Sequence, residues 1–185
     1  MVEVRLDDIG SGVLLNRSHD TSNFNSIDAD LNDFIKHDAL REQERMLSKT
    51  YLFIYSKIII GFITLSVDSV RAPYIKKGDL EFKYKKTIYT DLPCVLIGRL
   101  AVDRAFGGQD VGTYILNWAV GLITTEICGR VGCRYITVDP IVTPEYSAVD
   151  FYIKSGLGFT HMEEIRVYKT ETRLYINLYK SLTEE

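Results

Sequence analysis

The sequence contains few of the residues that cross-link small secreted domains or hold metal ions. Its 185 residues include three cysteines, four prolines and three histidines. Cys94, Cys128 and Cys133 form no CxxC pair, and the histidines are scattered along the chain. These spacings argue against a disulfide framework and against a structural zinc site. We therefore interpret the cysteines as buried free thiols and expect no metal site.

Long apolar runs and a surplus of positive charge are also missing. No apolar run reaches the ~20 residues that span a bilayer, and residues 1–8 lack the apolar core of a signal peptide. The expectation is a cytoplasmic protein with no membrane contact. The net charge is −3, whereas nucleic-acid binders usually carry a basic surplus. An RNA-binding function would therefore need a local basic face.

The residues that are present are ordinary for one globular domain. Hydrophobic residues make up 46% of the chain and charged residues 25%, and no repeat or Pro/Gly-rich linker divides it. We expect a single domain over residues 1–185. The hydrophobic periodicity predicts a mixed α/β fold. The predicted elements are a short strand at 12–16, a helix at 29–46 capped by Asp28, strands at 50–55, 58–67 and 94–102, a helix at 111–130, a strand at 134–141, a helix at 145–155, and strands at 159–168 and 173–179.

Two further expectations concern the surface. The charged segment 76–86 is predicted to be a loop or a short helix. In the last strand, Tyr175, Asn177 and Tyr179 alternate with aliphatic residues and are placed on the wetter face. That face is a candidate surface for a homodimer.

The most informative segment runs from an apolar strand through a glycine-bearing turn into a helix. The strand is 94–102, the turn is 106–112, and the amphipathic helix follows at once. A turn of this kind aims backbone N–H groups and the positive end of a helix at one point, which suits an anion such as a diphosphate.

This segment and a second motif resemble the GNAT family of N-acetyltransferases. Leu100-Ala101-Val102 matches the Leu-Ala-Val of the family's strand, and Phe151-Tyr152 followed by Gly158-Phe159 matches its Phe-Tyr…Gly-Phe signature. The resemblance covers residues 23–180. It implies the same element order, with a mostly antiparallel central sheet flanked by helices. It also implies acetyl-CoA as the acetyl donor and an enzyme that transfers acetyl to a primary amine.

The resemblance also implies which residues contact the cofactor. The family's turn, Gln/Arg-x-x-Gly-x-Gly/Ala, falls on residues 107–112, where Gly107 replaces the first residue and Asp110 the middle glycine. Asp tolerates a left-handed backbone, but its carboxylate would cap its own helix or repel a phosphate by roughly 1–4 kcal/mol. Arg99 and Arg104 are candidates to offset that charge, and we expect weakened cofactor binding. The cofactor-binding candidates are Leu100, Ala101, Val102, Gly107, Gly108, Gln109, Asp110, Val111, Gly112, Thr113 and Glu145.

For catalysis, the resemblance points to Tyr152 as the general acid that protonates the departing thiolate. A phenol stays protonated near neutral pH and can donate a hydrogen bond. The alternative is a ring that only packs on the sheet. No general base is identified, because Glu126 and Glu145 have no special spacing. The substrate amine is then expected to lose its proton to ordered water.

Three interpretations of the function stay open. In the first, the acceptor is a small-molecule or protein amine. The second rests on residues 25–34, with Ala39, Gln43 and Thr50-Tyr51, which resemble the toxin branch of the family. Those toxins acetylate aminoacyl-tRNA and are paired with an antitoxin. The third is a degenerate module that binds acetyl-CoA or a partner without turnover. The candidate RNA path consists of Arg41, Arg45, Lys49, Lys83, Lys85 and Lys86.

Overall fold

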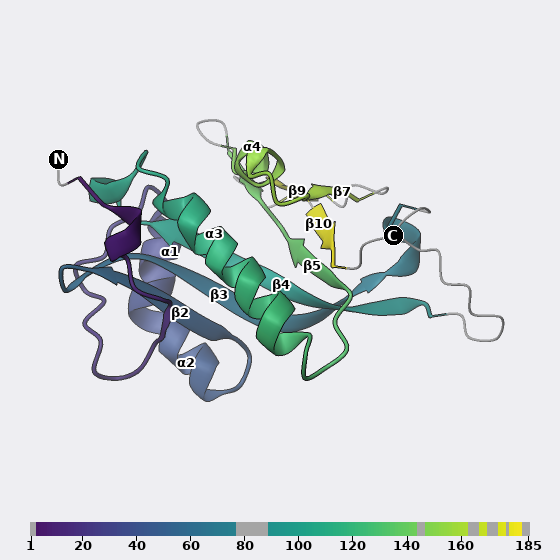
Figure 1. Cartoon of the computed structure of the whole chain (residues 1–185), viewed down its shortest axis with the longest axis horizontal. Helices are drawn as coiled ribbons and strands as arrows, with labels where there is room; N and C mark the ends of the chain where they lie inside the picture. Colours follow the sequence, from purple (N-terminus) through teal and green to yellow (C-terminus); the bar gives the residue numbers. More distant parts are fainter. Residues whose placement is uncertain are drawn as a thin grey trace. The chain divides into compact units, whose positions relative to one another are not determined.

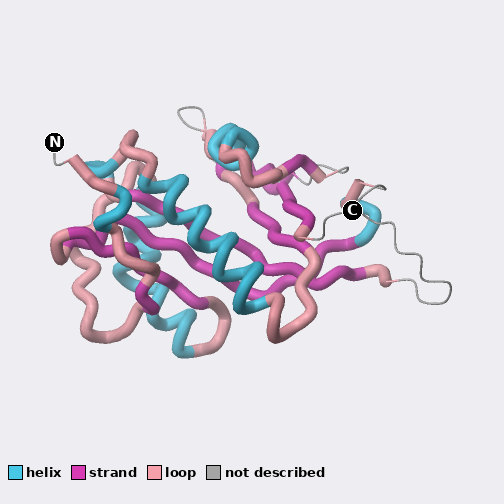
Figure 2. The backbone as a smooth tube through the Cα atoms, in the orientation of Figure 1, coloured by secondary structure: helices cyan, strands magenta, loops and turns pink. Residues whose placement is uncertain are grey.

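The computed structural model describes residues 3–76, 89–143, 147–162, 167–169, 174–176 and 178–182. It contains a seven-stranded sheet and a three-stranded sheet (Figures 1 and 2). The pairs β1–β2, β2–β3, β5–β10 and β7–β10 are antiparallel, which confirms the mixed α/β fold. In spatial order the larger sheet is β1 (Val13–Leu14), β2 (Lys49–Tyr55), β3 (Ile58–Arg71), β4 (Asp91–Val102), β5 (Tyr135–Val138), β10 (Leu178–Ser181) and β7 (Thr160–His161), and the smaller is β6 (Ile141–Val142), β9 (Leu174–Ile176) and β8 (Val167–Lys169).

The chain groups into two compact units. The first unit comprises residues 1–66 and 97–122, and the second unit comprises residues 67–96 and 123–185. β3 and β4 each contribute residues to both units. The single domain expected from the sequence stays a prediction.

In the first unit, the helix predicted at 29–46 is divided by a π-helical turn. α1 (Ala29–Asp33) leads into this turn at Phe34–Asp38, and α2 (Ala39–Glu44) follows. The Asp28 carboxylate accepts hydrogen bonds from the N–H groups of Asp30 and Leu31, at 2.9 and 3.4 Å. The predicted helix cap is therefore confirmed.

Helices cover both faces of the sheet in the first unit. Leu52 and Phe62, paired across β2 and β3, belong to the same buried cluster as Phe34 and Ala39 of the α1–α2 layer. The next residue along β2, Phe53, points to the opposite face and contacts Trp118 of α3 (Val111–Leu122) at 5.2 Å between ring centroids. Figure 1 shows α3 crossing the strands on the side opposite α1 and α2. Strand alternation thus builds a three-layer unit.

Two local features shape the strands of the first unit. One is the predicted hairpin between β2 and β3, and the other is a close packing contact between β3 and α3. Ser56 and Lys57, between β2 and β3, have φ of 48° and 67°, as a two-residue hairpin turn requires. At Gly61 of β3, an added Cβ would lie 2.5 Å from Cδ1 of Ile115 and 2.9 Å from the carbonyl oxygen of Ala101. Only glycine allows β3 to approach α3 this closely.

The second unit has its own buried cluster, and one expectation about it was wrong. Tyr179, placed on the wetter face by the sequence, is 0% exposed, and its ring packs against Tyr135 at 5.8 Å. β10 is paired on both sides, and the Tyr179 hydroxyl accepts a hydrogen bond from the Lys76 N–H at 3.2 Å. The cluster contains Val70, Ile75, Leu92, Cys94, Tyr135, Met162 and Tyr179.

Other predictions for the second unit are only partly met. Cys94 is a buried free thiol as expected, but Cys128 and Cys133 are half-buried. The helix expected at 145–155 appears as α4 (Val149–Lys154), and a π-helical turn, Ile123–Ile127, occupies part of the helix expected at 111–130. Residues 77–88, 144–146, 163–166, 170–173 and 177 lie outside the described residues, and so therefore do Lys83, Lys85, Lys86, Glu145 and Asn177. No helix among the described residues is long and apolar enough to cross a membrane.

Candidate functional site

The glycine turn after β4 has the backbone geometry of an open loop at a helix start. Asp103 begins it by accepting a hydrogen bond from the Ala105 N–H at 2.9 Å, and Phe106 is buried beneath it. Gly108 and Asp110 have φ of 72° and 58°, and α3 begins at the next residue. Left-handed backbone is accessible mainly to Gly, Asn and Asp, so the two positions carry suitable residues.

Asp110 keeps the turn but brings an exposed charge to it. Its carboxylate makes no hydrogen bond with the other described residues, so it does not occupy the N–H groups of its own helix. A negative side chain next to the positive end of α3 is favourable for the free protein. It is unfavourable for a second anion at the same place.

The two arginines that were candidates to offset this charge are engaged elsewhere in the first unit. The guanidinium of Arg99 lies 3.7 Å from the centroid of the Phe34 ring and 3.4 Å from Oε2 of Glu42. Arg104 donates hydrogen bonds to the carbonyl oxygens of Ser26 and Ile27, at 2.8 and 3.3 Å. Neither arginine forms an ion pair with Asp110 among the described residues, and charge compensation by Arg104 stays a prediction.

Among the remaining cofactor candidates of the first unit, some have buried side chains and others have exposed main-chain groups. Ala101 and Val111 are buried, so only their main-chain groups can meet a ligand. Leu100, Val102, Gly112 and Thr113 are half-buried. A Cβ added at Gly108 would meet no atom within 4 Å, and at Gly107 only the Arg104 carbonyl oxygen at 3.5 Å. The turn is therefore an uncovered backbone surface. Gln109 directs its side-chain oxygen to the Val4 N–H, at 2.8 Å.

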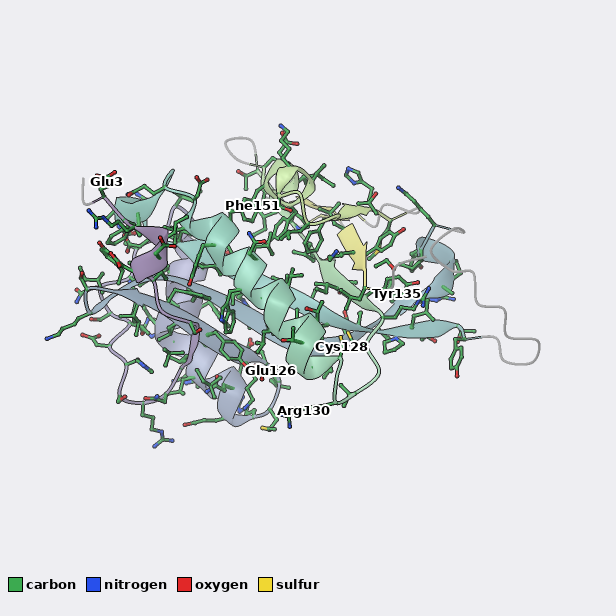
Figure 3. The ribbon with its side chains drawn as sticks, viewed as in Figure 1. Glu3, Glu126, Cys128, Arg130, Tyr135 and Phe151 are labelled. Carbon is green, nitrogen blue, oxygen red and sulfur yellow. The ribbon has the colours of Figure 1, made fainter. Side chains whose placement is uncertain are left out.

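Tyr152, the candidate general acid, lies on α4 in the second unit. It is 5% exposed, and its ring contacts those of Phe151 and Phe159, with centroids 5.0 and 5.6 Å apart (Figure 3 labels Phe151). Gly156 and Gly158, with φ of 76° and 82°, stop the helix and turn the chain back so that Phe159 reaches Tyr152. The Phe-Tyr…Gly-Phe signature thus forms one aromatic cluster. Of the two carboxylates without special spacing, Glu126 is exposed on a π-helical turn.

A hollow in the first unit was not foreseen from the sequence. It has a volume of about 350 Å³, an aliphatic floor of Leu15, Ile35 and Leu40, and a rim that includes Lys36 and Arg41. Arg17 also lines it and is held by Glu44, with two hydrogen bonds of 2.9 and 2.8 Å to one carboxylate oxygen. The helical spacing of Ile35, Lys36, Leu40 and Arg41 was the only available signal, since Arg17 comes from an irregular segment. The remaining lining residues are Asn16, His19, Thr21 and Glu44.

Comparisons with known proteins place the fold. No protein-family model matches the chain. A tRNA-acetylating toxin of Mycobacterium tuberculosis is 26% identical over 119 residues, which cover 64% of this chain and 68% of that protein. The structure of a tyrosine-to-phenylalanine mutant of KacT has a TM-score of 0.72 at 20% identity and covers 94% of this chain and 96% of that one.

A second similar solved structure contains bound ligands. It is a tyrosine-to-phenylalanine mutant of the AtaT toxin bound to the C-terminus of the antitoxin AtaR and to acetyl-CoA. The TM-score is 0.67 at 19% identity, and the match covers 95% of this chain and 94% of that one. The comparisons confirm that this chain has the α/β fold of the GNAT acetyltransferases and resembles their toxin-like branch.

Proposed function

We propose that this protein is an acetyl-CoA-dependent N-acetyltransferase whose acceptor is the amino group of aminoacyl-tRNA. The observation that carries the proposal is the uncovered turn 107–110 at the start of α3, in a fold whose similar proteins include a tRNA-acetylating toxin. This acceptor was the second interpretation of the sequence, and the comparisons favour it over a small-molecule or protein amine.

The turn fits the diphosphate of acetyl-CoA. Gly107 and Gly108 present backbone without side chains, and the 12-residue helix α3 adds its positive end. Main-chain groups of Leu100 to Val102 would bind the pantetheine arm. Acetyl-CoA supplies the activated acetyl thioester.

Tyr152 would act at the end of the reaction. The acceptor amine, after losing a proton to water, attacks the thioester carbonyl, so that a C–N bond forms and the C–S bond breaks. The nitrogen releases its second proton to solvent as the amide forms. The Tyr152 hydroxyl then gives its proton to the thiolate and recovers one from solvent. Both neighbouring structures described above carry a tyrosine-to-phenylalanine substitution, and the same chemical change can be made at Tyr152.

The basic rim of the hollow supports an anionic acceptor. Arg17 is paired with Glu44, which also lines the hollow, and Arg41 lies 4.0 Å from Asp38. The basic side chains that remain available for an acceptor are those of Lys36 and the exposed Arg41, although the net charge of the chain is −3. We propose that these side chains contact RNA phosphates. The double variant Lys36→Ala/Arg41→Ala should then raise KM for aminoacyl-tRNA several-fold and lower the salt dependence of binding by about 1–2 in log–log slope. Arg130→Ala, an exposed arginine of the second unit, is the matched control.

The deciding experiment measures thiol release from acetyl-CoA with charged tRNA, uncharged tRNA and a panel of small amines. Release with charged tRNA alone, together with acetylated aminoacyl ester as product, is the expected result. Release with small amines alone would overturn the tRNA acceptor and leave the acetyltransferase. Binding of acetyl-CoA without release in any arm would support the non-catalytic module.

An antitoxin partner and a cytoplasmic location belong to the same proposal. The AtaT structure was solved with an antitoxin segment, and we propose a partner of this kind for the present chain. Growth arrest on expression, relieved by a small adjacent gene, is the expected result. Expression without arrest would count against the toxin role. Homodimerisation through the last strand stays a prediction.

A further inference from the structure

The N-terminal residues of the chain contact the glycine turn once and helix α3 twice. The Val4 N–H donates a hydrogen bond to Oε1 of Gln109 at 2.8 Å, just before the helix starts. One turn into the helix, the Tyr114 hydroxyl donates to the carbonyl oxygen of Ile9 at 2.8 Å. A further turn along, a Cβ at Gly12 would lie 2.7 Å from the Trp118 ring. We call residues 3–12 the N-terminal arm; Figure 1 shows it beside the start of α3.

The arm is held at both of its ends. Immediately after it, β1 pairs with β2, with Val13 opposite Leu52. Along the arm, Val4 and Ile9 are buried, with 9% and 4% exposed, on either side of a short 3₁₀ turn at Leu6–Asp8. A segment anchored in this way can hold the atoms that it touches.

The atom that the arm holds belongs to the cofactor turn. Gln109 stands between Gly108 and Asp110, the two residues with left-handed backbone. Such conformations persist when the surrounding structure determines them. Gly107, Gly108 and Asp110 are exposed, so Gln109 is the only residue of 107–110 with appreciable burial. Its side chain is therefore the point through which the rest of the first unit can fix the turn.

The Val4–Gln109 hydrogen bond also directs the side-chain oxygen of Gln109 away from a phosphate at the turn. The side-chain oxygen of Gln109 is a hydrogen-bond acceptor and cannot bind a phosphate oxygen. While the Val4 N–H occupies it, this oxygen is not offered to the ligand. Gln109, predicted from the sequence as a cofactor contact, then acts through the turn.

We propose that the N-terminal arm is a strap that keeps the cofactor turn in its ligand-ready conformation, with Gln109 as the positioning residue. This inference rests on the proposed function, because it assigns the turn to the diphosphate of acetyl-CoA. Loss of the Val4–Gln109 bond lets the turn leave the left-handed conformation, and acetyl-CoA must then restore it on binding. The affinity for acetyl-CoA falls accordingly, while the reaction of bound acetyl-CoA is unaffected.

The test compares Val4→Pro, which removes the N–H donor, with Val4→Ala, which keeps it. Calorimetry with acetyl-CoA should show a roughly three- to tenfold higher Kd for Val4→Pro, the effect of one hydrogen bond, and no change for Val4→Ala. Hydrogen exchange of the amides of residues 107–113, measured without ligand, should become faster in Val4→Pro alone. The value of kcat at saturating acetyl-CoA should stay the same.

A second variant guards against misfolding at Val4. Gln109→Met keeps the side-chain length and removes the acceptor, and the double variant Val4→Pro/Gln109→Met should bind acetyl-CoA no more weakly than either single variant. Additive losses, or equal Kd and exchange rates in Val4→Pro and Val4→Ala, would refute the strap. If the wild-type protein does not bind acetyl-CoA, the proposed function fails, and the ligand-free exchange rates still decide whether the arm holds the turn.

Discussion

At the scale of single residues, Asp110 combines an unusual backbone conformation with an unusual charge. Its φ of 58° is compatible with Asp but is more easily adopted by Gly. The motif predicted the left-handed turn, because the family has glycine there. It could not show that Arg99 and Arg104 are bound to Glu42 and to the Ser26 carbonyl, since these partners are distant in sequence.

Replacing Asp110 by glycine should strengthen acetyl-CoA binding. Removal of a like charge from an exposed site relieves about 1 kcal/mol, so calorimetry should give a Kd about fivefold lower. Asp110→Asn is the matched control, because it removes the charge and keeps a residue that tolerates left-handed backbone. Equal gains in both variants would assign the effect to charge, and unchanged affinity in both would contradict the repulsion.

Tyr152→Phe should slow turnover and leave binding intact. Loss of a general acid typically costs 10²–10⁴-fold, so we expect kcat to fall by about 100-fold or more with an unchanged Kd for acetyl-CoA. The ring stays in contact with Phe151 and Phe159, and the fold should survive. Tyr74→Phe, in the same unit, is the control. Full turnover by Tyr152→Phe would remove the hydroxyl from the mechanism.

At the scale of elements, β3 packs closely against α3 in the first unit at the position of one glycine. Gly61 allows β3 to lie against α3 near Ile115 and Ala101. Gly98 of β4, by contrast, has its nearest atom, the Thr64 carbonyl oxygen, 4.0 Å from an added Cβ. Packing therefore requires glycine at Gly61 but not at Gly98, although the two residues lie in adjacent strands.

Gly61→Ala should destabilise the protein and Gly98→Ala should not. A methyl group at Gly61 overpacks the contact, which costs about 1–3 kcal/mol of unfolding free energy. At Gly98 the same change fits and reduces the backbone entropy of the unfolded chain. Denaturant unfolding monitored by circular dichroism measures both. Similar stabilities of the two variants would show that α3 can move to accept the methyl group.

Sequence patterns predict that these helices and strands exist, but not their internal geometry or their partners. The amphipathic stripe of 29–46 predicts a helix, but a period of 3.6 does not reveal the extra residue of the π-helical turn at Phe34–Asp38. Alternation in 173–179 predicts a strand, yet the segment contributes to two sheets, as β9 and β10. Tyr179 is buried because remote segments pair with β10 on both sides. The hollow is lined by Arg17 and Arg41 from separate segments, and neither local pattern predicts that they share one surface.

At the scale of the whole molecule, two thiols with raised pKa values, those of Cys94 and Cys133, couple stability to pH. Burial raises the pKa of Cys94 from about 9 to about 11 and that of Cys133 to about 12. The unfolded chain therefore loses these protons first as the pH rises. The free energy of unfolding should be insensitive to these thiols below pH 9 and should decrease between pH 9 and 11.

Chemical denaturation across this pH range measures the effect. Cys94→Ala should flatten the decline between pH 9 and 11, since it removes a thiol that is protonated only in the folded state. Val95→Ala, at a buried position of the same strand without a titratable group, is the control. An identical decline in Cys94→Ala and the unmodified protein would exclude Cys94 as its source.

The first unit is not continuous in the sequence, and this affects when it is completed during synthesis. The first unit is interrupted after Ser66 and is completed only by Ile97–Leu122. A ribosome thus releases α1, α2, β1 and β2 long before the segment that completes their unit. That late segment also carries the turn 107–110. Under the proposed function, a nascent chain therefore gains its acetyl-CoA site only after residue 122 has left the exit tunnel.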